Sequence, residues 1–163
     1  MTKRSARSKR TKTRPVAADA YAAFMSRAYA MELEATERYA RFADELEAQD
    51  NDEVAMLFRK LAEIEALHAK RILAEMGWAS RPALGPAFAW EGKEGPETAP
   101  LNALRKALQP HQALQIALRC ELKARKYFET ISAGAARVRA AAEEMAAEER
   151  EHAALIREWL ARL

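Results

Sequence analysis

Hydrophobic positions recur every three or four residues along most of the chain, which is the spacing of one face of an α-helix. The polar run 49–52 interrupts this pattern, and Gly77 and Gly134 mark two later ends. Pro110 is expected either to kink a helix or to lie in its first turn. The pattern predicts four helices, at about residues 16–46, 53–76, 101–131 and 136–160.

Residues 77–100 depart from this pattern because they hold four of the five glycines and four of the six prolines. A connection of this length can run along a whole bundle, whereas short loops join antiparallel neighbours. The sequence therefore predicts an all-α fold, a ferritin-like four-helix bundle of two antiparallel helix pairs joined by one long crossover. Trp78, Phe88 and Trp90 are expected to pack this crossover against the bundle.

Residues 1–15 form a separate basic segment. Residues 1–14 carry seven Lys and Arg and no acid, and the remaining chain holds 20 basic and 24 acidic residues. Without a hydrophobic period this segment is predicted to be a disordered tail, and residues 16–163 to be one domain. Weak contact with nucleic acid or another polyanion, a solubilising role and a targeting role all stay open for the tail.

The composition excludes several classes of protein. Cys120 is the one cysteine among 163 residues, so neither an internal disulfide framework nor a four-cysteine metal module is present. No apolar run approaches the ~20 residues that span a membrane, so no membrane partner is expected. A cytoplasmic protein is the prediction, since a lone cysteine suits a reducing compartment.

Six residues suggest a buried metal site. Four glutamates interrupt otherwise apolar stripes, and two of them have a histidine three residues later, on the same helix face. Buried carboxylates without partners are costly, and two divalent ions would balance four of them. Carboxylate and imidazole ligands suit iron or manganese. The predicted ligands are Glu32, Glu65, His68, Glu121, Glu149 and His152.

Five other residues in these helices carry polar or reactive side chains. Tyr39 and Tyr127 are expected either to lie near the metals or to pack in the core, and Arg125 is the candidate inward-facing cation. His111 lies about 15 Å along a helix from Glu121, at 1.5 Å per residue, so it is expected at the surface. Cys120 points away from the stripe and is expected to pack.

Residues 18–162 resemble the rubrerythrin branch of the ferritin-like superfamily. The likeness rests on Glu32 with Glu37-Arg38-Tyr39 and on Glu65-Ala-Leu-His68, and in the second half on Glu121 and Glu148-Glu149-Arg-Glu-His152. The resemblance implies two metal ions, most readily Fe/Fe, with Fe/Mn and Mn/Mn left open. It implies that Glu32 and Glu121 are terminal ligands, that Glu65 and Glu149 bridge, and that one histidine completes each ion.

The resemblance predicts a non-haem di-iron oxidoreductase that reacts its centre with hydrogen peroxide or dioxygen. The chain departs from rubrerythrins in lacking the rubredoxin cysteines and in having Ala124 and Arg125 where an extra carboxylate would lie. A separate electron-donor protein is therefore expected, and the resemblance implies a homodimer. A ferroxidase or iron-handling protein, and a metal-independent interaction protein that uses the basic tail, are the alternatives.

Overall fold

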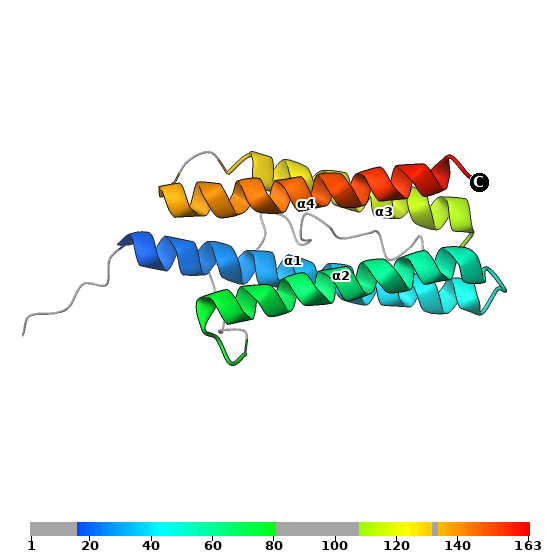
Figure 1. The fold of residues 1–163 in the computed structure, drawn as a ribbon, viewed down its shortest axis with the longest axis horizontal. Helices are drawn as coiled ribbons and strands as arrows, with labels where there is room; N and C mark the ends of the chain where they lie inside the picture. Colours follow the sequence, from blue (N-terminus) through cyan, green and yellow to red (C-terminus); the bar gives the residue numbers. More distant parts are fainter. Residues whose placement is uncertain (1–15, 81–107, 132–133) are drawn as a thin grey trace, which may run out of the picture.

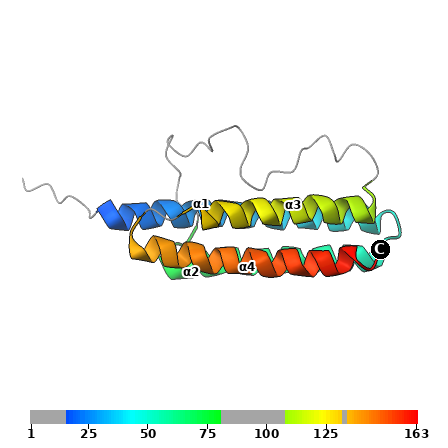
Figure 2. The ribbon, with the colours of Figure 1, turned by 90° about the horizontal axis from the view of Figure 1, so that it is seen from above.

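The computed structural model describes residues 16–80, 108–131 and 134–163 (Figure 1). Within these ranges the chain forms α1 (Val16–Glu47), α2 (Asp52–Met76), α3 (Pro110–Glu129) and α4 (Ala136–Leu160). Helix α1 packs on α2, α3 packs on α4, and α1 also contacts α4. Seen from above, α1 and α3 form one layer and α2 and α4 the other (Figure 2). The predicted all-α, ferritin-like four-helix bundle is confirmed.

Three of the four helices begin and end within one residue of their predicted limits. Gly77 ends α2 in the left-handed conformation, with φ of 64°, and its amide bonds back to Ala74. That backbone conformation is easily adopted by glycine, which explains why α2 ends there. Asn51 precedes α2 without making a side-chain cap. Its side-chain amide instead donates a hydrogen bond to the backbone carbonyl of Gln49.

The predicted limits of the third helix are wrong. Helix α3 begins at Pro110 rather than near residue 101, since Leu108 and Gln109 are not helical. Proline suits the first turn of a helix because its missing amide hydrogen would have no helical partner there. The helix ends at Glu129, two residues before the predicted end.

Three predicted stretches lie outside the described residues. They are the basic tail at 1–15, most of the crossover at 81–100, and the first part of the predicted third helix at 101–107. Phe88 and Trp90 fall in the second of these. Among the helices that the structure describes, none is long and apolar enough to cross a membrane.

The core consists of two apolar clusters with a polar layer between them. One cluster contains Tyr39, Phe42, Phe58, Leu114 and Ile156, and the other contains Phe24, Met25, Ile72, Phe128 and Met145. Every helix contributes to both clusters, on either side of its glutamate in the predicted stripe. The layer of acids is therefore held in place from both ends by apolar packing, which burial of nonpolar area stabilises.

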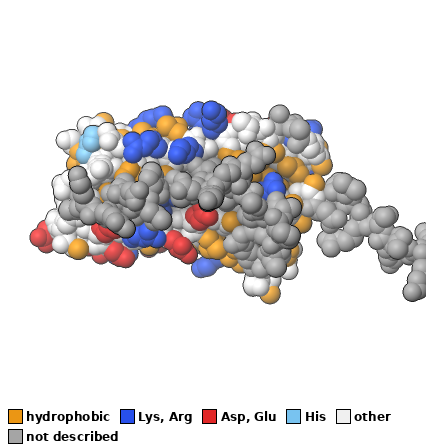
Figure 3. Space-filling view, turned by 180° about the vertical axis from the view of Figure 1, so that it is seen from behind, with side chains coloured by type: hydrophobic (Ala, Val, Ile, Leu, Met, Phe, Trp, Pro, Cys, Tyr) orange, Lys and Arg blue, Asp and Glu red, His pale blue; other side chains and the backbone are white. Residues whose placement is uncertain are grey.

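Charged side chains are unevenly distributed over the described part of the face seen in Figure 3. Figure 3 shows acidic side chains gathering towards the end of the bundle where α1 turns into α2. Arg59 of α2 bonds there to Asp44 at 2.5 Å and to Glu47 at 2.7 Å. These ion pairs link the two helices next to their turn.

Phe58 tests the cluster at the α1–α2 end of the bundle. Its ring is fully buried, and the centroid of the ring lies 5.3 Å from that of Phe42 and 5.7 Å from that of Tyr39. Phe58→Ala should lower the free energy of unfolding by about 3–5 kcal/mol, because it leaves a cavity in a packed core. Met56→Ala, at a 67% exposed position, should change it by no more than about 0.5 kcal/mol. Chemical denaturation measures both, and equal effects would contradict the assigned core.

Candidate metal centre

The bundle brings all six predicted ligands into one layer. Each helix supplies one glutamate. This glutamate lies where the apolar stripe of the helix passes between the two apolar clusters. Five of the six side chains are buried and His68 is partly exposed. The contributing residues are Glu32 from α1, Glu65 and His68 from α2, Glu121 from α3, and Glu149 and His152 from α4.

His152 faces carboxylates from three helices. Its Nδ1 lies 3.1 Å from Oε1 of Glu65, 3.3 Å from Oε2 of Glu121 and 3.4 Å from Oε2 of Glu149. Ligand atoms of these four residues all lie within 4.8 Å of one another. Neighbouring donors on an octahedral ion with bonds of about 2.1 Å are about 3.0 Å apart. The four donors therefore have nearly the spacing that one ion requires.

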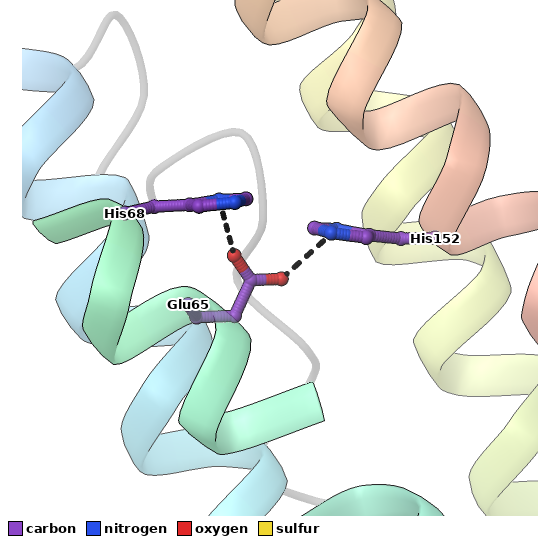
Figure 4. A group of neighbouring side chains, drawn as sticks. All are labelled: Glu65, His68 and His152. Carbon is purple, nitrogen blue, oxygen red and sulfur yellow. Dashed lines mark ion pairs between the residues drawn. The ribbon is translucent and has the colours of Figure 1, made fainter. Parts of the chain in front are cut away.

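His68 is placed similarly on the other side of Glu65. Its Nδ1 lies 3.4 Å from Oε2 of Glu65 and 3.6 Å from Oε2 of Glu32. The rings of His68 and His152 are nearly parallel, with centroids 5.5 Å apart. Glu65 thus directs one carboxylate oxygen to each histidine, as Figure 4 shows. This is the position of a carboxylate that bridges two ions.

Several atoms in this layer that could bind a metal ion are buried and lack a hydrogen-bond partner. They include Oε2 of Glu65, Oε2 of Glu121 and Nδ1 of His152. Buried polar atoms are normally paired, because an unpaired one costs about 1–3 kcal/mol. Converging carboxylates and imidazoles are the ligand set that suits iron or manganese. The residues therefore fit a dinuclear metal site.

Burial and the neighbouring charged groups shift the pKa values of His152 and Glu65 in opposite directions. Burial alone would lower the pKa of His152, but Glu121, Glu149 and Glu65 outweigh it and raise that pKa far above its usual range. Burial alone would raise the pKa of Glu65, and His152 and His68 reverse the effect so that it falls well below its usual range. A protonated histidine thus neutralises part of the acid layer, a role that a metal cation would take over.

Tyr39 is the predicted neighbour that the structure places against the cluster. Its hydroxyl donates a hydrogen bond to Oε1 of Glu121, and its ring is fully buried between Phe42 and Phe58. The hydrogen bond fixes one oxygen of Glu121, and Oε2 is the oxygen that faces His152. Tyr39 therefore orients a predicted ligand.

The other candidates have different surroundings. Arg125 pairs with Glu129 at 3.3 Å on its own helix, and the ring of Tyr127 packs edge-on against Phe128. Neither interaction involves the acid layer. His111 is exposed and Cys120 is buried in the core cluster with Tyr39, as predicted for both.

Sequence reasoning assigned no role to two residues beside the site, although Glu148 belongs to the motif that carries the resemblance. Glu148 lies with Oε2 at 3.8 Å from Nδ1 of His68, and Arg71 bonds to Glu148 at 2.6 Å. Arg71 is three residues after His68 and Glu148 precedes Glu149, so their spacing relative to the predicted ligands was the available signal. Neither interrupts an apolar stripe, and for that reason neither stood out.

Three comparisons place this geometry among known proteins. Residues 23–81 match the family model described as Rubrerythrin, which covers Glu32, Glu65 and His68. No curated protein matches the sequence. The crystal structure of an uncharacterised conserved protein from Magnetospirillum magnetotacticum MS-1 is similar, with a TM-score of 0.72 and 28% identity. The similarity covers 86% of this chain and 93% of that one.

The fold and the site define a class, a ferritin-like four-helix bundle with a buried carboxylate and histidine cluster that could hold metal. The match over α1 and α2 confirms the resemblance to the rubrerythrin family that the sequence predicted. Residues 23–81 are therefore similar to the rubrerythrin family. The structure adds Glu121, Glu149 and His152 from the half that the family model does not cover.

Metal binding should be strongly dependent on pH. The raised pKa of His152 keeps this ring protonated at neutral pH in the metal-free protein, whereas a metal ligand must be neutral. Binding of Mn²⁺ should release about one proton or more, and affinity should fall from about pH 8 to about pH 6 as protons compete. Calorimetric titration in two buffers of different ionisation enthalpy measures the release. An affinity that does not change with pH would contradict this assignment.

Tyr39→Phe tests whether the hydroxyl orients Glu121. Loss of such a hydrogen bond behind a ligand typically lowers metal affinity about 10–100-fold. The matched control is Tyr127→Phe, which removes a hydroxyl that lies near Arg27 of α1, a residue outside the six predicted ligands. Equilibrium titration with Mn²⁺ should show weaker binding for the first variant and unchanged binding for the second. Equal affinities would contradict the role given to Tyr39.

Proposed function

We propose that this chain is a non-haem di-iron oxidoreductase that reduces hydrogen peroxide or dioxygen at the acid layer. The observation that carries the proposal is the position of Glu65, whose two oxygens lie 3.1 Å and 3.4 Å from the two histidines. A carboxylate placed between two imidazoles, with three further carboxylates around them, supports two ions rather than one. Iron is the first choice, and mixed or paired manganese remains open.

The proposed ligands divide into two sets around Glu65. Glu121, Glu149 and His152 would hold one ion, and Glu32 and His68 the other. When bound, the ions would supply electrons and Lewis acidity for reduction of the oxidant. The protein would fix the donors between two apolar clusters and limit the access of water. Tyr39 holds a proton on its hydroxyl next to Glu121, within one hydrogen bond of the site.

Electrons for repeated turnover would come from outside these 163 residues. The chain holds a single cysteine, which is buried, so it cannot itself form a four-cysteine electron-transfer module. We therefore propose a separate electron-donor protein as the partner. A homodimer is also proposed, on the resemblance alone.

The test compares the two oxidants on ferrous protein. Anaerobic loading should give two iron ions per chain, and peroxide or dioxygen should oxidise both, which optical and Mössbauer spectra follow. His152→Ala should abolish the loading of two iron ions per chain, because it removes the imidazole that faces three of the carboxylates. The matched control, His111→Ala, changes an exposed histidine and should load and react like the original chain.

Three outcomes separate the proposal from its alternatives. Oxidation of both ions by peroxide or dioxygen, with re-reduction and repeated turnover, supports the oxidoreductase. Uptake and oxidation of many more than two iron ions per chain would favour iron handling instead. Unchanged folding of Glu65→Ala combined with His152→Ala, together with no bound metal in the original chain, would favour a metal-independent interaction protein.

A further inference from the structure

The two sides of the acid layer differ in their access to solvent. The side chain of His152 is 8% exposed, and it faces Glu121 and Glu65, which are more deeply buried. The side chain of His68 is 16% exposed and faces Glu148, which is 19% exposed. An ion approaching from solvent therefore meets the His68 side of the layer first.

An ion pair between α2 and α4 closes this more open side. Arg71 Nη2 lies 2.6 Å from Oε1 of Glu148 and 2.9 Å from its Oε2. The same Oε2 lies 3.8 Å from Nδ1 of His68. Glu148 thus has Arg71 on one side and a proposed ligand on the other. Its carboxylate is one more acid than the six-ligand set requires.

A pocket of about 180 Å³ is lined by Arg71, the cationic partner in this ion pair. It lies between α1, α2 and α4 and is lined on its polar side by Arg71, Glu75 and Glu144. Glu144 is one helical turn before Glu148 on α4. Arg137 also lines the pocket and is engaged there, 4.0 Å over the ring of Tyr21 and 3.8 Å from Glu75. Glu75 and Glu144 thus line the pocket, and Glu148, one turn further along α4, lies 3.8 Å from His68.

Beyond Glu148 lies a buried oxygen with no hydrogen-bond partner. Oε2 of Glu65 is 3.4 Å from Nδ1 of His68, and this carboxylate is only 2% exposed. An unpaired carboxylate oxygen at the inner end of the route provides a place for a cation. Arg71 lines the pocket and bonds to Glu148, and Nδ1 of His68 lies next to both Glu148 and the unpaired oxygen of Glu65.

We propose that Glu148 is the carboxylate that first binds a divalent cation entering from this pocket and passes it to His68, Glu32 and Glu65. Arg71 holds Glu148 at the rim and releases it when a cation arrives. This inference rests on the proposed metal centre and adds its route of loading. It predicts that Glu148 controls the rate of loading rather than the final number of ions.

The test measures association of Co²⁺, which gives a visible absorption band in carboxylate and imidazole sites and needs no oxidant. In stopped-flow mixing, Glu148→Gln should slow the loading of Co²⁺ about tenfold or more, since a charge that steers ions changes association rates by such factors. Both Co²⁺ ions should still bind at equilibrium. Glu148→Asp, which keeps the charge, should restore most of the rate and covers the case in which the glutamine variant does not fold.

The matched control is Glu129→Gln. Glu129 pairs with Arg150 at 3.4 Å between α3 and α4, and both line a second pocket, of about 270 Å³. This variant removes the same charge from a similar ion pair away from His68, so loading rates should be unchanged. A partly exposed ion pair contributes little to stability, and thermal unfolding should confirm that both variants are folded.

Arg71→Gln should have the opposite effect, because it frees Glu148 and speeds both entry and release of Co²⁺. If Arg71 acts through Glu148, the same change made in the Glu148→Gln background should give no acceleration. Acceleration that persists in that background would show that Arg71 acts by its own charge, and would overturn its role as the holder of Glu148.

The remaining outcomes separate this inference from the proposed function. If the original chain binds no Co²⁺, or one ion per chain, the dinuclear centre itself is wrong. If it binds two ions, and Glu148→Gln loads as fast as Glu129→Gln, the centre stands and the entry route is wrong. Slow loading confined to the Glu148→Gln variant, with two ions bound at the end, supports the route.

Discussion

The burial of four carboxylates in one layer is the constraint on which the rest of the structure depends. Charged groups removed from water require partners, and the layer is closed at both ends by apolar clusters. Two histidines supply part of the compensation, which is why the pKa of His152 rises so far. Tyr39 adds a hydrogen bond to Glu121. Some carboxylate and imidazole atoms of the layer still lack a hydrogen-bond partner and point at one another. Metal cations are the partners that suit such atoms.

The same constraint explains the organisation of the bundle. Helices α1 and α2 pack closely, as do α3 and α4, while the acid layer lies where the two pairs face each other. Glu65 of α2 meets His152 of α4, and Arg71 of α2 meets Glu148 of α4. Polar contacts thus join the pairs at the layer where apolar side chains are interrupted. A protein that needed only stability would gain by replacing this layer with hydrophobic residues.

Much of this arrangement could be predicted from the sequence because it depends on periodicity. Acids that interrupt an apolar stripe at helical spacing must face inward, which identified Glu32, Glu65, Glu121 and Glu149. The start of α3 was missed because apolar residues before Pro110 continue a helical spacing that the proline ends. Arg71 and Glu148 were assigned no role because their ion pair depends on how α2 and α4 lie together, which spacing within one helix does not reveal.

The central claim is that the layer holds two ions on either side of Glu65. Anomalous diffraction from crystals of the Mn²⁺-loaded protein measures this most directly. The account predicts two anomalous peaks per chain, one beside His152 and one beside His68, with the Glu65 carboxylate between them. A single peak, or peaks away from these three residues, would contradict it.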